Sequence, residues 1–538
     1  MSSLTSPSKK VSTLKKNTEE RYNSIADHIS KHILKTACNG VDSRLCLAFG
    51  TFSQQVKGYF AGFNTFKYAT SVRLIGKESD NGFVNEIEYE REGFHTDSIR
   101  GTSKADTSAA GTSKADTYKS YAILKSSRLS NADNLMYEYR VGQYINKFNR
   151  IYPCFLETYG LLKYKTDQDW ENLASDNVET DPHERVEFLK GLAIQPVDYS
   201  VACTESRNLA ILIQHFNNFT ALFDLMYNED FIRTELMYVL FQLYIPLAQM
   251  KDTFTHYDLH LNNLYVYEPV PGKYIQYHYH LVPGMAPVSF KSKYMLKIID
   301  YGSSYFKDTT EEEDSQTFIN KICKIPTNTT KCDNDGCGHN VGSKKHINKN
   351  QNEDLYPLFV LNKALKYKTK LLPQQLHIIL DKVLYTGKEI NSYNEEMSYA
   401  NFLNRIRLVY KKKGGTKKKG GTRVRRTNPS KTTKKMRRIR IRRTNPSKTT
   451  KKMRGTRIGG TPSKTTKKMS EIDVTKYFAE KIYTVQDAAN HFVWNIVNEK
   501  LKEKNIKDHE SETKLGDLHV YLDGTEMVFD MNPESSET

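Results

Sequence analysis

The sequence predicts an α+β protein that is large enough for a two-lobed enzyme with additional segments. Its 538 residues are several times the usual length of a domain. Short segments rich in β-branched and aromatic residues recur before residue 216, and longer segments with helical spacing of apolar residues follow. A third observation is the tract Lys411–Met469, which holds 25 of the 80 Lys and Arg residues and no Asp or Glu. We expect this tract to be a disordered insertion.

Residues 1–40 are expected to form an N-terminal extension, and residues 41–215 a first lobe with a sheet. Within the extension, Met1–Asn17 should be disordered, and the isoleucines of Arg21–Lys35 recur at helical spacing. A repeat of GTSKADT, at Gly101–Thr107 and Gly111–Thr117, predicts a solvated loop insertion over 95–118. The predicted elements of the first lobe are the strands Val72–Ile75, Val84–Tyr89 and Tyr121–Lys125, the helix Leu129–Phe148, and the buried strand Leu209–His215.

Residues 216–410 are expected to form a mainly helical second lobe. The apolar pattern predicts helices over Phe231–Lys251, Leu355–Tyr367 and Pro373–Tyr385. It also predicts two strands, Tyr274–Leu281 and Tyr294–Ile299, on either side of a turn at Pro283-Gly284. After the basic repeats of residues 411–470, residues 471–538 should form a C-terminal helical segment, with a helix over Tyr477–Lys500, and a tail.

Two short strings carry the chemistry: HYDLHLNN at His256–Asn263 and KIIDYG at Lys297–Gly302. Their aspartates, Asp258 and Asp300, are 42 positions apart. The first fits the pattern H-x-D-L-x-x-x-N of phosphoryl transfer, and the second fits the metal-binding D-x-G that follows it. Transfer of a phosphoryl group needs a carboxylate to orient the acceptor hydroxyl, and an Asn and a second Asp to hold magnesium on the phosphates. Asp258, Asn263 and Asp300 are the candidates for these roles.

Lys125 and Glu138 are candidates for gripping the nucleotide phosphates. YAILK places Lys125 at the end of a strand, and NLMYEYRVG places Glu138 on the following helix. A strand Lys that binds phosphates and is held by a helix Glu is the arrangement that accompanies the two motifs. Taken alone, both residues would be read as surface charges. Glu90 and Glu92 are weaker alternatives to Glu138.

Upstream, IGKESDNGFV is an imperfect glycine-rich loop in which Gly76 and Gly82 could bring backbone amides to phosphates. The middle glycine of such a loop is missing. An ordinary strand–turn–strand with glycine in the turn is the alternative. The position of the loop ahead of Lys125 favours phosphate binding.

In these motifs the chain resembles the protein-kinase superfamily, and more narrowly the divergent kinase-like proteins of giant nucleocytoplasmic DNA viruses. The similar strings are NLMYEYRVGQYINK, FTHYDLHLNN and YMLKIIDYGSSYF, and the resemblance covers about Asp42–Tyr410. It implies a bilobal protein-kinase-like fold, a mainly antiparallel sheet lobe over a helical lobe, with ATP and Mg²⁺ bound in the cleft. It also implies the following roles: Lys125 binds phosphate with Glu138 as its partner, Asp258 is the catalytic base, Asn263 and Asp300 bind magnesium, and Asp354 braces the catalytic loop.

Three departures from the family pattern leave the function open. Tyr257 stands where many regulated kinases have Arg, so control by a phosphorylated activation loop is not expected. His260, which we include among the catalytic candidates, replaces a catalytic-loop Lys, and D-L-H-x-x-N also resembles aminoglycoside and choline kinases. No A-P-E follows Asp300. A serine/threonine protein kinase, a small-molecule kinase and a catalytically inert pseudokinase scaffold therefore remain as hypotheses, and the hydroxyl acceptor is unidentified.

Two groups of metal-ligand residues are interpreted as structural. Cys323, Cys332, Cys337 and His339 lie in a turn-rich segment whose spacing matches no paired-cysteine zinc site, so a plain loop is favoured over metal. His278 and His280 alternate on one strand and are expected to be partly exposed histidines rather than ligands.

The remaining features concern the compartment. Seven scattered cysteines are unlike a disulfide framework and favour a reducing compartment. The first residues lack the apolar core of a signal peptide, and no apolar run approaches the ~18–20 residues needed to cross a bilayer. We expect a soluble intracellular protein without a membrane partner.

Outside the basic tract the chain has 55 basic and 62 acidic residues, a net charge of −7. The tract repeats TNPSKTTKKM from Thr427 and Thr444, with a variant from Gly460. It could bind nucleic acid by counterion release, act as a nuclear localisation signal, present acceptors such as Ser430, Ser447 and Ser463, or be a neutral repeat expansion.

Deleting Lys411–Met469 should remove most nucleic-acid binding and leave folding and ATP hydrolysis intact, because the positive charge is concentrated in this segment. The measurement is the affinity for a DNA duplex at increasing salt, for the full chain and the deletion variant. The affinity of the full chain should fall steeply with salt. An unchanged affinity after deletion would place the binding surface elsewhere.

Overall fold

The computed structural model describes residues 44–50, 53–76, 82–92, 117–128, 134–175, 181–194, 208–216, 219–322, 348–365, 372–387 and 481–531. The chain divides into two units, and all of these residues belong to the unit formed by Met1–Ile406 and Phe478–Thr538. Several expectations fall outside the described residues: the N-terminal extension 1–40, the loop insertion 95–118 except for its last two residues, the cluster Cys323, Cys332, Cys337 and His339, and the basic repeats.

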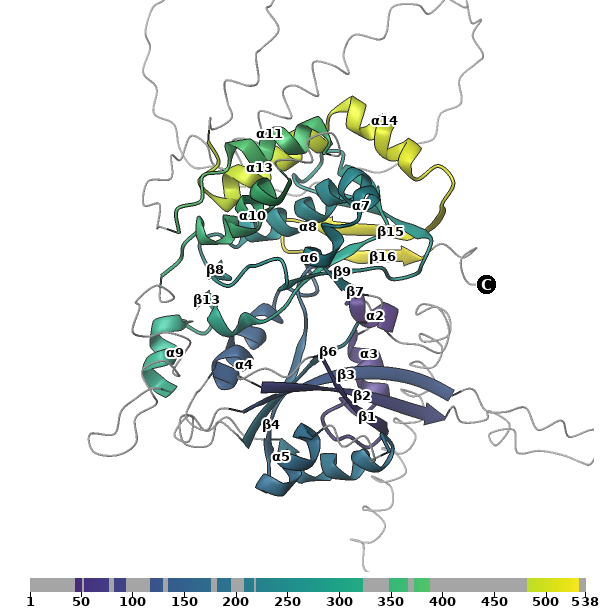
Figure 1. The fold of residues 1–538 in the computed structure, drawn as a ribbon, viewed down its shortest axis with the longest axis vertical. Helices are drawn as coiled ribbons and strands as arrows, with labels where there is room; N and C mark the ends of the chain where they lie inside the picture. Colours follow the sequence, from purple (N-terminus) through teal and green to yellow (C-terminus); the bar gives the residue numbers. More distant parts are fainter. Residues whose placement is uncertain are drawn as a thin grey trace, which may run out of the picture. The chain divides into compact units, whose positions relative to one another are not determined.

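A six-stranded antiparallel sheet contains all four strands expected in the first lobe (Figure 1). β2 and β3 are long, and buried and less buried side chains alternate along both, as expected for strands with different surroundings on their two faces. In spatial order the strands are β1 (Ala69–Ile75), β2 (Gly82–Glu92), β3 (Thr117–Ser127), β6 (Leu209–Gln214), β4 (Thr158–Tyr164) and β5 (Leu192–Ile194).

The two faces of this sheet belong to different hydrophobic cores. Leu212 on β6 packs in a core with side chains of α3 (Ser53–Tyr59) and α5 (Asp167–Ala174). Ile211, its neighbour on the same strand, packs in a second core with side chains of α4 (Asn134–Ile145). Successive residues of a strand point to opposite faces. The alternation therefore places α4 on one face of the sheet, the face toward which Lys125 points.

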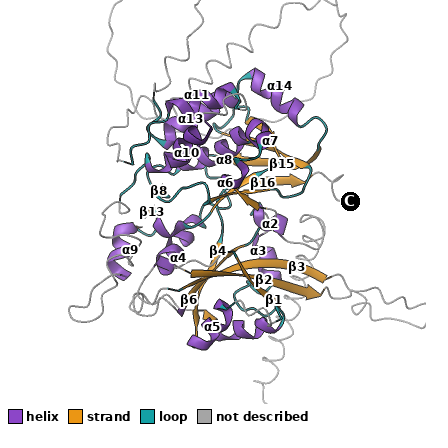
Figure 2. Ribbon diagram, in the orientation of Figure 1, coloured by secondary structure: helices purple, strands orange, loops and turns teal. Residues whose placement is uncertain are grey.

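Most of the remaining helices lie near α8 in the ribbon of Figure 2. Nearly all residues of α8 are buried, and α7 and α13 pack against it. Tyr244 of α8 stacks on Phe492 of α13, with 5.6 Å between the ring centroids. The expected helix Phe231–Lys251 is divided at Glu235 into α7 and α8. The bounds of these and the other helices are α2 (Arg44–Ala48), α6 (Leu222–Leu225), α7 (Glu229–Thr234), α8 (Leu236–Gln249), α9 (Ser315–Ile322), α10 (Tyr356–Leu365), α11 (Gln374–Lys382), α13 (Val485–Ile496) and α14 (Glu499–Asp508).

The C-terminal segment contributes two strands that the sequence analysis does not anticipate. β15 (Thr513–Tyr521) pairs in parallel with β10 (Lys273–His280), and β16 (Val528–Met531) pairs with β15. On its other side β10 pairs with β11 (Val288–Ser292), so the strand that follows the turn at Gly284 is β11 and not the expected strand Tyr294–Ile299. Residues 471–538 thus contain a sheet edge as well as helices.

Two small sheets support the motif loops. The first consists of β12 (Met295–Ile298), β9 (Leu264–Tyr267) and β7 (Phe219–Ala221), and β12 ends two residues before Asp300. The second consists of β14 (Glu313–Asp314), β13 (Tyr305–Asp308) and β8 (Phe254–Thr255). Short 3₁₀ helices span Glu184–Gly191, Tyr301–Ser303 and Glu353–Leu355.

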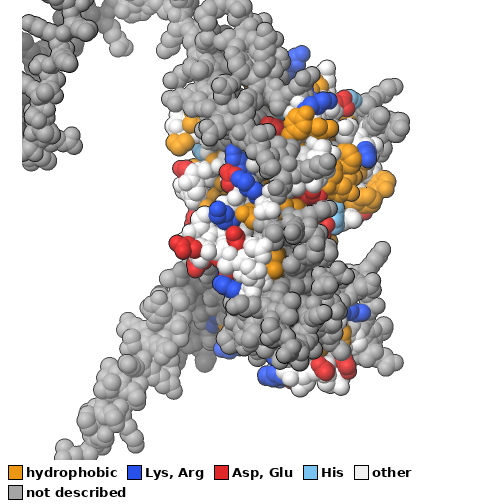
Figure 3. All heavy atoms as spheres, turned by 90° about the vertical axis from the view of Figure 1, so that its left-hand side faces the viewer, with side chains coloured by type: hydrophobic (Ala, Val, Ile, Leu, Met, Phe, Trp, Pro, Cys, Tyr) orange, Lys and Arg blue, Asp and Glu red, His pale blue; other side chains and the backbone are white. Residues whose placement is uncertain are grey.

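The surface and the cysteines bear on the compartment expectations. Cys46 is disulfide-bonded, which the scattered cysteine pattern does not predict, and Cys154 is a buried free thiol. On the face drawn in Figure 3, the Lys, Arg, Asp and Glu side chains of the described residues are intermixed. Within the described part of the chain, every helix is too short or too polar to span a bilayer.

We expect Leu518→Ala to lower the free energy of unfolding by about 2–5 kcal/mol, because Leu518 of β15 is 0% exposed and its truncation leaves a cavity in the main core. Val528→Ala on the neighbouring β16, at a side chain that is 44% exposed, should change it by less than about 1 kcal/mol. Denaturant unfolding measures both. Equal losses would mean that β15 is not packed as described.

Candidate functional site

The ammonium of Lys125 joins three segments that are distant in the sequence. Lys125 lies on β3, and its Nζ is 2.7 Å from Oε2 of Glu138 on α4 and 2.9 Å from Oδ1 of Asp300, which follows β12. Three of the predicted residues therefore meet at one point. The carboxylate of Glu138 is buried, whereas the side chain of Asp300 remains 41% exposed and can reach a ligand.

The electrostatics of this cluster follow from burial and from charge pairing. Burial alone would lower the pKa of Lys125, but attraction to Asp300 and Glu138 outweighs it and raises the pKa above its usual range, so the amine stays charged. Burial raises the pKa of Glu138, against the opposing influence of Lys125. The ion pair is thus the reason that Glu138 can be charged in this environment.

Two residues of the motif loops have backbones in the left-handed region. Tyr257, which precedes Asp258, has φ of 65°, and Asp300 has φ of 65° and ψ of 71°. Non-glycine residues adopt this conformation at a cost of about 1–3 kcal/mol, so the surroundings must hold them there. Both strained residues lie next to or at a predicted catalytic position.

The loop His256–Asn263 folds back on itself around Asp258. Nδ2 of Asn263 donates to the backbone oxygen of Asp258 at 2.8 Å and lies 3.4 Å from its Oδ2. Nε2 of His260 lies 3.7 Å from Oδ1 of Asp258, close enough for an ion pair when His260 is protonated. The side chains of Asp258 and His260 are each about two-fifths exposed and open to an acceptor molecule.

A buried carboxylate, Asp354, holds this loop from behind. The backbone N–H of His256 lies 3.0 Å from both of its oxygens, and the N–H of Tyr257 lies 3.2 Å from Oδ1. Nε2 of His256 in turn is 3.0 Å from the carbonyl oxygen of Ile299. Because burial lowers the pKa of His256, the ring is neutral and donates this hydrogen bond. The loop is thereby connected to the residue that precedes Asp300.

Asn263 and Asp300 offer ligand atoms that suit magnesium. The side-chain nitrogen of Asn263 donates to Asp258, so the side-chain oxygen Oδ1 of Asn263 is left as a ligand atom. Asp300 supplies a carboxylate. The N–H of Ile299 donates to the carbonyl of Asn263 at 3.1 Å, so the two candidates lie on adjoining segments. Mg²⁺ is commonly held by one or two protein oxygens together with phosphates and water. This pair fits such a site.

The two glycines of the predicted phosphate-binding loop lie in different surroundings. Gly82 lies within β2 opposite Ser127, and a Cβ there would come 2.4 Å from the carbonyl oxygen of Ser126, so glycine is required by the close approach of β3. Gly76 has φ of +78° and open space where a Cβ would stand. Gly76 thus retains the geometry of a loop glycine, and Gly82 has a packing reason of its own.

The alternatives weighed in the sequence are placed elsewhere. Glu90 pairs with Lys119, so it is not the partner of Lys125. His278 contacts Ser289 and Asp517, and His280 contacts His519, in the sheet of β10 and β15. Among the described residues no group of three His, Cys, Asp or Glu side chains is arranged to hold a metal ion.

Sequence reasoning missed the charged residues that surround α4. Arg140 and Lys147 of the helical segment contact Asp308 in the segment that follows Asp300. Two signals could have found them: Arg140 and Lys147 are seven residues apart and share one helical face, and an acidic run, Glu311–Asp314, lies downstream of the D-x-G motif.

No protein-family model matches this chain, and no curated protein matches it. The resemblance to protein kinases therefore remains a prediction carried by the motifs.

We expect Asp354→Ala to destabilise the protein by about 2–4 kcal/mol, because two buried backbone N–H groups lose their acceptor. Asp354→Asn keeps an acceptor oxygen and should cost less. Thermal or denaturant unfolding measures the difference. If both variants were as stable as the parent, the brace would carry no stability.

The burial of the Asp354 carboxyl group also predicts that the stability of the protein depends on pH. Burial raises the pKa of Asp354 from 3.8 to about 7. The folded state then binds this proton more tightly than the unfolded state, so the stability it contributes is complete below about pH 4 and is lost as pH rises to about 7. The free energy of unfolding of the parent should therefore fall more between pH 4 and 7 than that of Asp354→Asn. Parallel curves would contradict this.

Proposed function

We propose that this protein is an ATP-dependent phosphotransferase, most specifically a serine/threonine protein kinase with the bilobal fold of that superfamily. It would transfer the γ-phosphate of Mg-ATP to a hydroxyl group. The nucleotide would bind between the six-stranded sheet and the helices around α8, against β3 and the loop at Asp300.

The observation that carries the proposal is the meeting of Lys125, Glu138 and Asp300. The three residues belong to separate motifs. Lys125 lies on a strand, Glu138 lies on the next helix, and Asp300 lies 175 positions after Lys125. Their side chains form one ionic cluster. A protein in which these residues served only as surface charges would have no reason to bring them together.

Each residue then has a distinct task. Lys125, oriented by Glu138, would bind the phosphates. Asp300 and the side-chain oxygen of Asn263 would hold magnesium, which would neutralise charge on the phosphates. Asp258 would accept a hydrogen bond from the acceptor hydroxyl and take its proton as the bond to phosphorus forms. The Asn263 amide, bonded to Asp258, keeps that carboxylate in the loop geometry.

The acceptor hydroxyl would approach Asp258 from the side where His260 lies. His260, 3.7 Å from Asp258, would supply a positive charge near the transferred group when protonated. A histidine at this position also suits a small hydroxylated acceptor, so a small-molecule kinase is the second candidate. Assays with a mixture of generic protein acceptors and, separately, with aminoglycosides and choline distinguish the two.

We expect Lys125→Met and Asp300→Ala each to remove magnesium-dependent ATP turnover, because no other residue in the cluster can supply the lost charge. The measurement is ATP consumption by the purified protein, beside Asp258→Asn. Lys119→Met is the matched control: Lys119 lies on the same strand and the same face, six residues earlier, and pairs with Glu88 and Glu90 away from the cluster.

Three outcomes separate the hypotheses. Turnover in the parent and in Lys119→Met, with loss in the other variants, supports the phosphotransferase. Turnover that persists in Lys125→Met and Asp300→Ala contradicts the assignments and indicates a contaminating kinase. An inactive parent that still binds ATP would favour the pseudokinase scaffold.

A further inference from the structure

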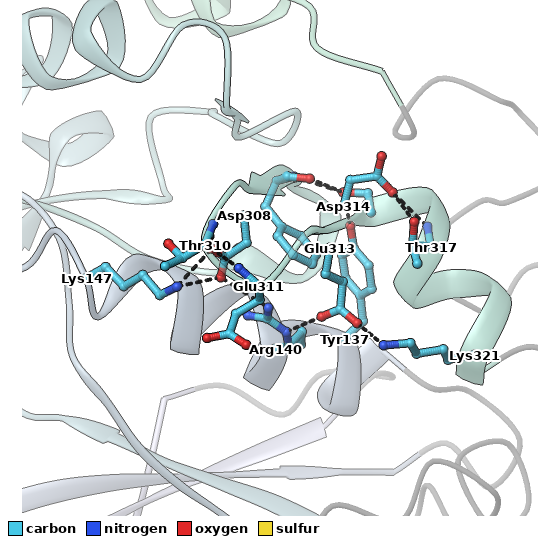
Figure 4. A network of polar contacts seen from close by, with 12 residues as sticks. Tyr137, Arg140, Lys147, Asp308, Thr310, Glu311, Glu313, Asp314, Thr317 and Lys321 are labelled. Carbon is cyan, nitrogen blue, oxygen red and sulfur yellow. Dashed lines mark hydrogen bonds and ion pairs between the residues drawn. The ribbon is translucent and has the colours of Figure 1, made fainter.

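A buried ionic cluster ties α4 to the segment that follows Asp300 (Figure 4). Nε of Arg140 is 2.6 Å from Oε2 of Glu313, and its Nη2 is 3.2 Å from Oδ2 of Asp308. Nζ of Lys147 is 2.8 Å from each oxygen of Asp308, and Lys321 pairs with the second oxygen of Glu313. We call Arg140, Lys147, Asp308 and Glu313 the α4 clamp.

Three of the four clamp side chains are largely buried, unlike those of an ordinary surface ion pair, and only Lys147 is 37% exposed. The side chains of Asp308, Glu313 and Arg140 are 1%, 8% and 12% exposed. Burial alone would raise the pKa of Asp308, but hydrogen bonds from Lys147 and Arg140 outweigh it and lower the pKa to about 2. The backbone N–H groups of Thr310 and Glu311 also donate to Asp308. Asp308 is therefore ionised at neutral pH, and both carboxylates are held in position by several hydrogen bonds and ion pairs.

The clamp connects α4, which carries Glu138, with the strands next to the motif loop that begins at His256. Arg140 is two residues from Glu138 on α4, and its guanidinium covers the ring of Phe306. Asp308 and Glu313 face each other on β13 and β14, and β13 pairs with β8, which leads into His256. Tyr137 of α4 adds a hydrogen bond from its hydroxyl to the carbonyl oxygen of Ser304. The position of α4 is thus set against the strand pair beside the motif loop.

We propose that Arg140 is a positioning residue that holds α4 where Glu138 reaches Lys125. Because Asp308 and Glu313 supply the negative charge that Arg140 needs, this position of α4 does not depend on phosphorylation. The inference rests on the proposed function and specifies its regulation. A phosphate orders a segment by offering negative charge to basic side chains. Here two carboxylates already pair with Arg140 of α4 and with Lys147, two residues beyond its end, so an added phosphate in the segment 301–322 has no free cation of the clamp to engage.

The energetic argument concerns what happens when the clamp is broken. Removing one member of a buried ion pair leaves an uncompensated charge, which is strongly destabilising for that local arrangement. In Arg140→Ala, Glu313 still has Lys321 and Asp308 still has Lys147, so the fold is retained. What is lost is the link from the middle of α4, two residues from Glu138. The effect should therefore appear in nucleotide use more than in global stability.

The experiment measures kcat/KM for ATP and amide hydrogen exchange in the full-length protein. Arg140→Ala should lower kcat/KM at least tenfold and speed exchange in residues 134–145, with the unfolding temperature changed little. Arg140→Lys should recover part of the loss, because an ammonium can still reach a carboxylate. Arg150→Ala is the matched control: Arg150 follows α4, and its pair with Glu526 is exposed, so it should behave as the parent. Glu313→Gln removes one charge with almost no change of shape and provides a second test if Arg140→Ala does not fold.

Phosphatase treatment of the parent is the complementary arm, and kcat/KM should be unchanged. A folded Arg140→Ala or Glu313→Gln variant with the parental kcat/KM and parental exchange in α4 overturns the inference and leaves the proposed function standing. A tenfold loss after phosphatase treatment overturns the independence from phosphorylation. A parent that neither binds nor consumes ATP overturns the proposed function, and the positioning role with it.

Discussion

The structure around the site depends on the need to surround one ammonium with carboxylates. Lys125 lies on a strand whose face is covered by α4, so its side chain is only 27% exposed, and removal from water without counter-charges would favour loss of its proton. Glu138 and Asp300 satisfy it from two different elements. A single ion cluster thereby fixes the distance from β3 to α4 and from β3 to the end of β12. The two hydrophobic cores set the layers, but they do not determine position along the helix axis this closely.

A second set of contacts holds the motif loops in conformations that they would not adopt alone. Tyr257 and Asp300 are both in the left-handed region, and each is surrounded by fixed hydrogen bonds. Asp354 binds the backbone on both sides of the His256–Tyr257 peptide, and His256 binds Ile299. Because the strain and the bonds occur in the same short segments, the hydrogen bonds can hold the loops in these conformations. Preorganised groups of this kind stabilise charge in a transition state without reorganisation.

Local patterns predicted four strands of the six-stranded sheet, and they selected Lys125, Glu138 and Asp300 as candidates, whose side chains the structure places together. Alternation identified β2 and β3, and it placed Lys125 within reach of a Glu on the next helix. Long-range pairing was not predictable in the same way: β10 and β15 pair in parallel although 239 positions separate His278 from Asp517, and nothing local in either strand specifies the other. Gly82 shows the limit of motif reading, since the close approach of Ser126 explains a glycine there without any phosphate. The break at Glu235 was invisible because the apolar pattern continues through it.

The position of α4 links the two ionic clusters. Glu138 connects the helix to Lys125, and Arg140, two residues later, connects it to Asp308 and Glu313. If α4 moved away from the sheet, Lys125 would keep Asp300, but the buried carboxylate of Glu138 would lose Lys125 as its counter-charge, and Arg140 would lose its contacts with Asp308 and Glu313. The loss of the counter-charge of Glu138 alone costs on the order of several kcal/mol in a buried setting. A movement of α4 away from the sheet is therefore too costly in free energy to regulate this site. Control, where it exists, has to act on groups that remain exposed and are not held by the clamp: the carboxylates of Asp258 and Asp300 and the acceptor that approaches them.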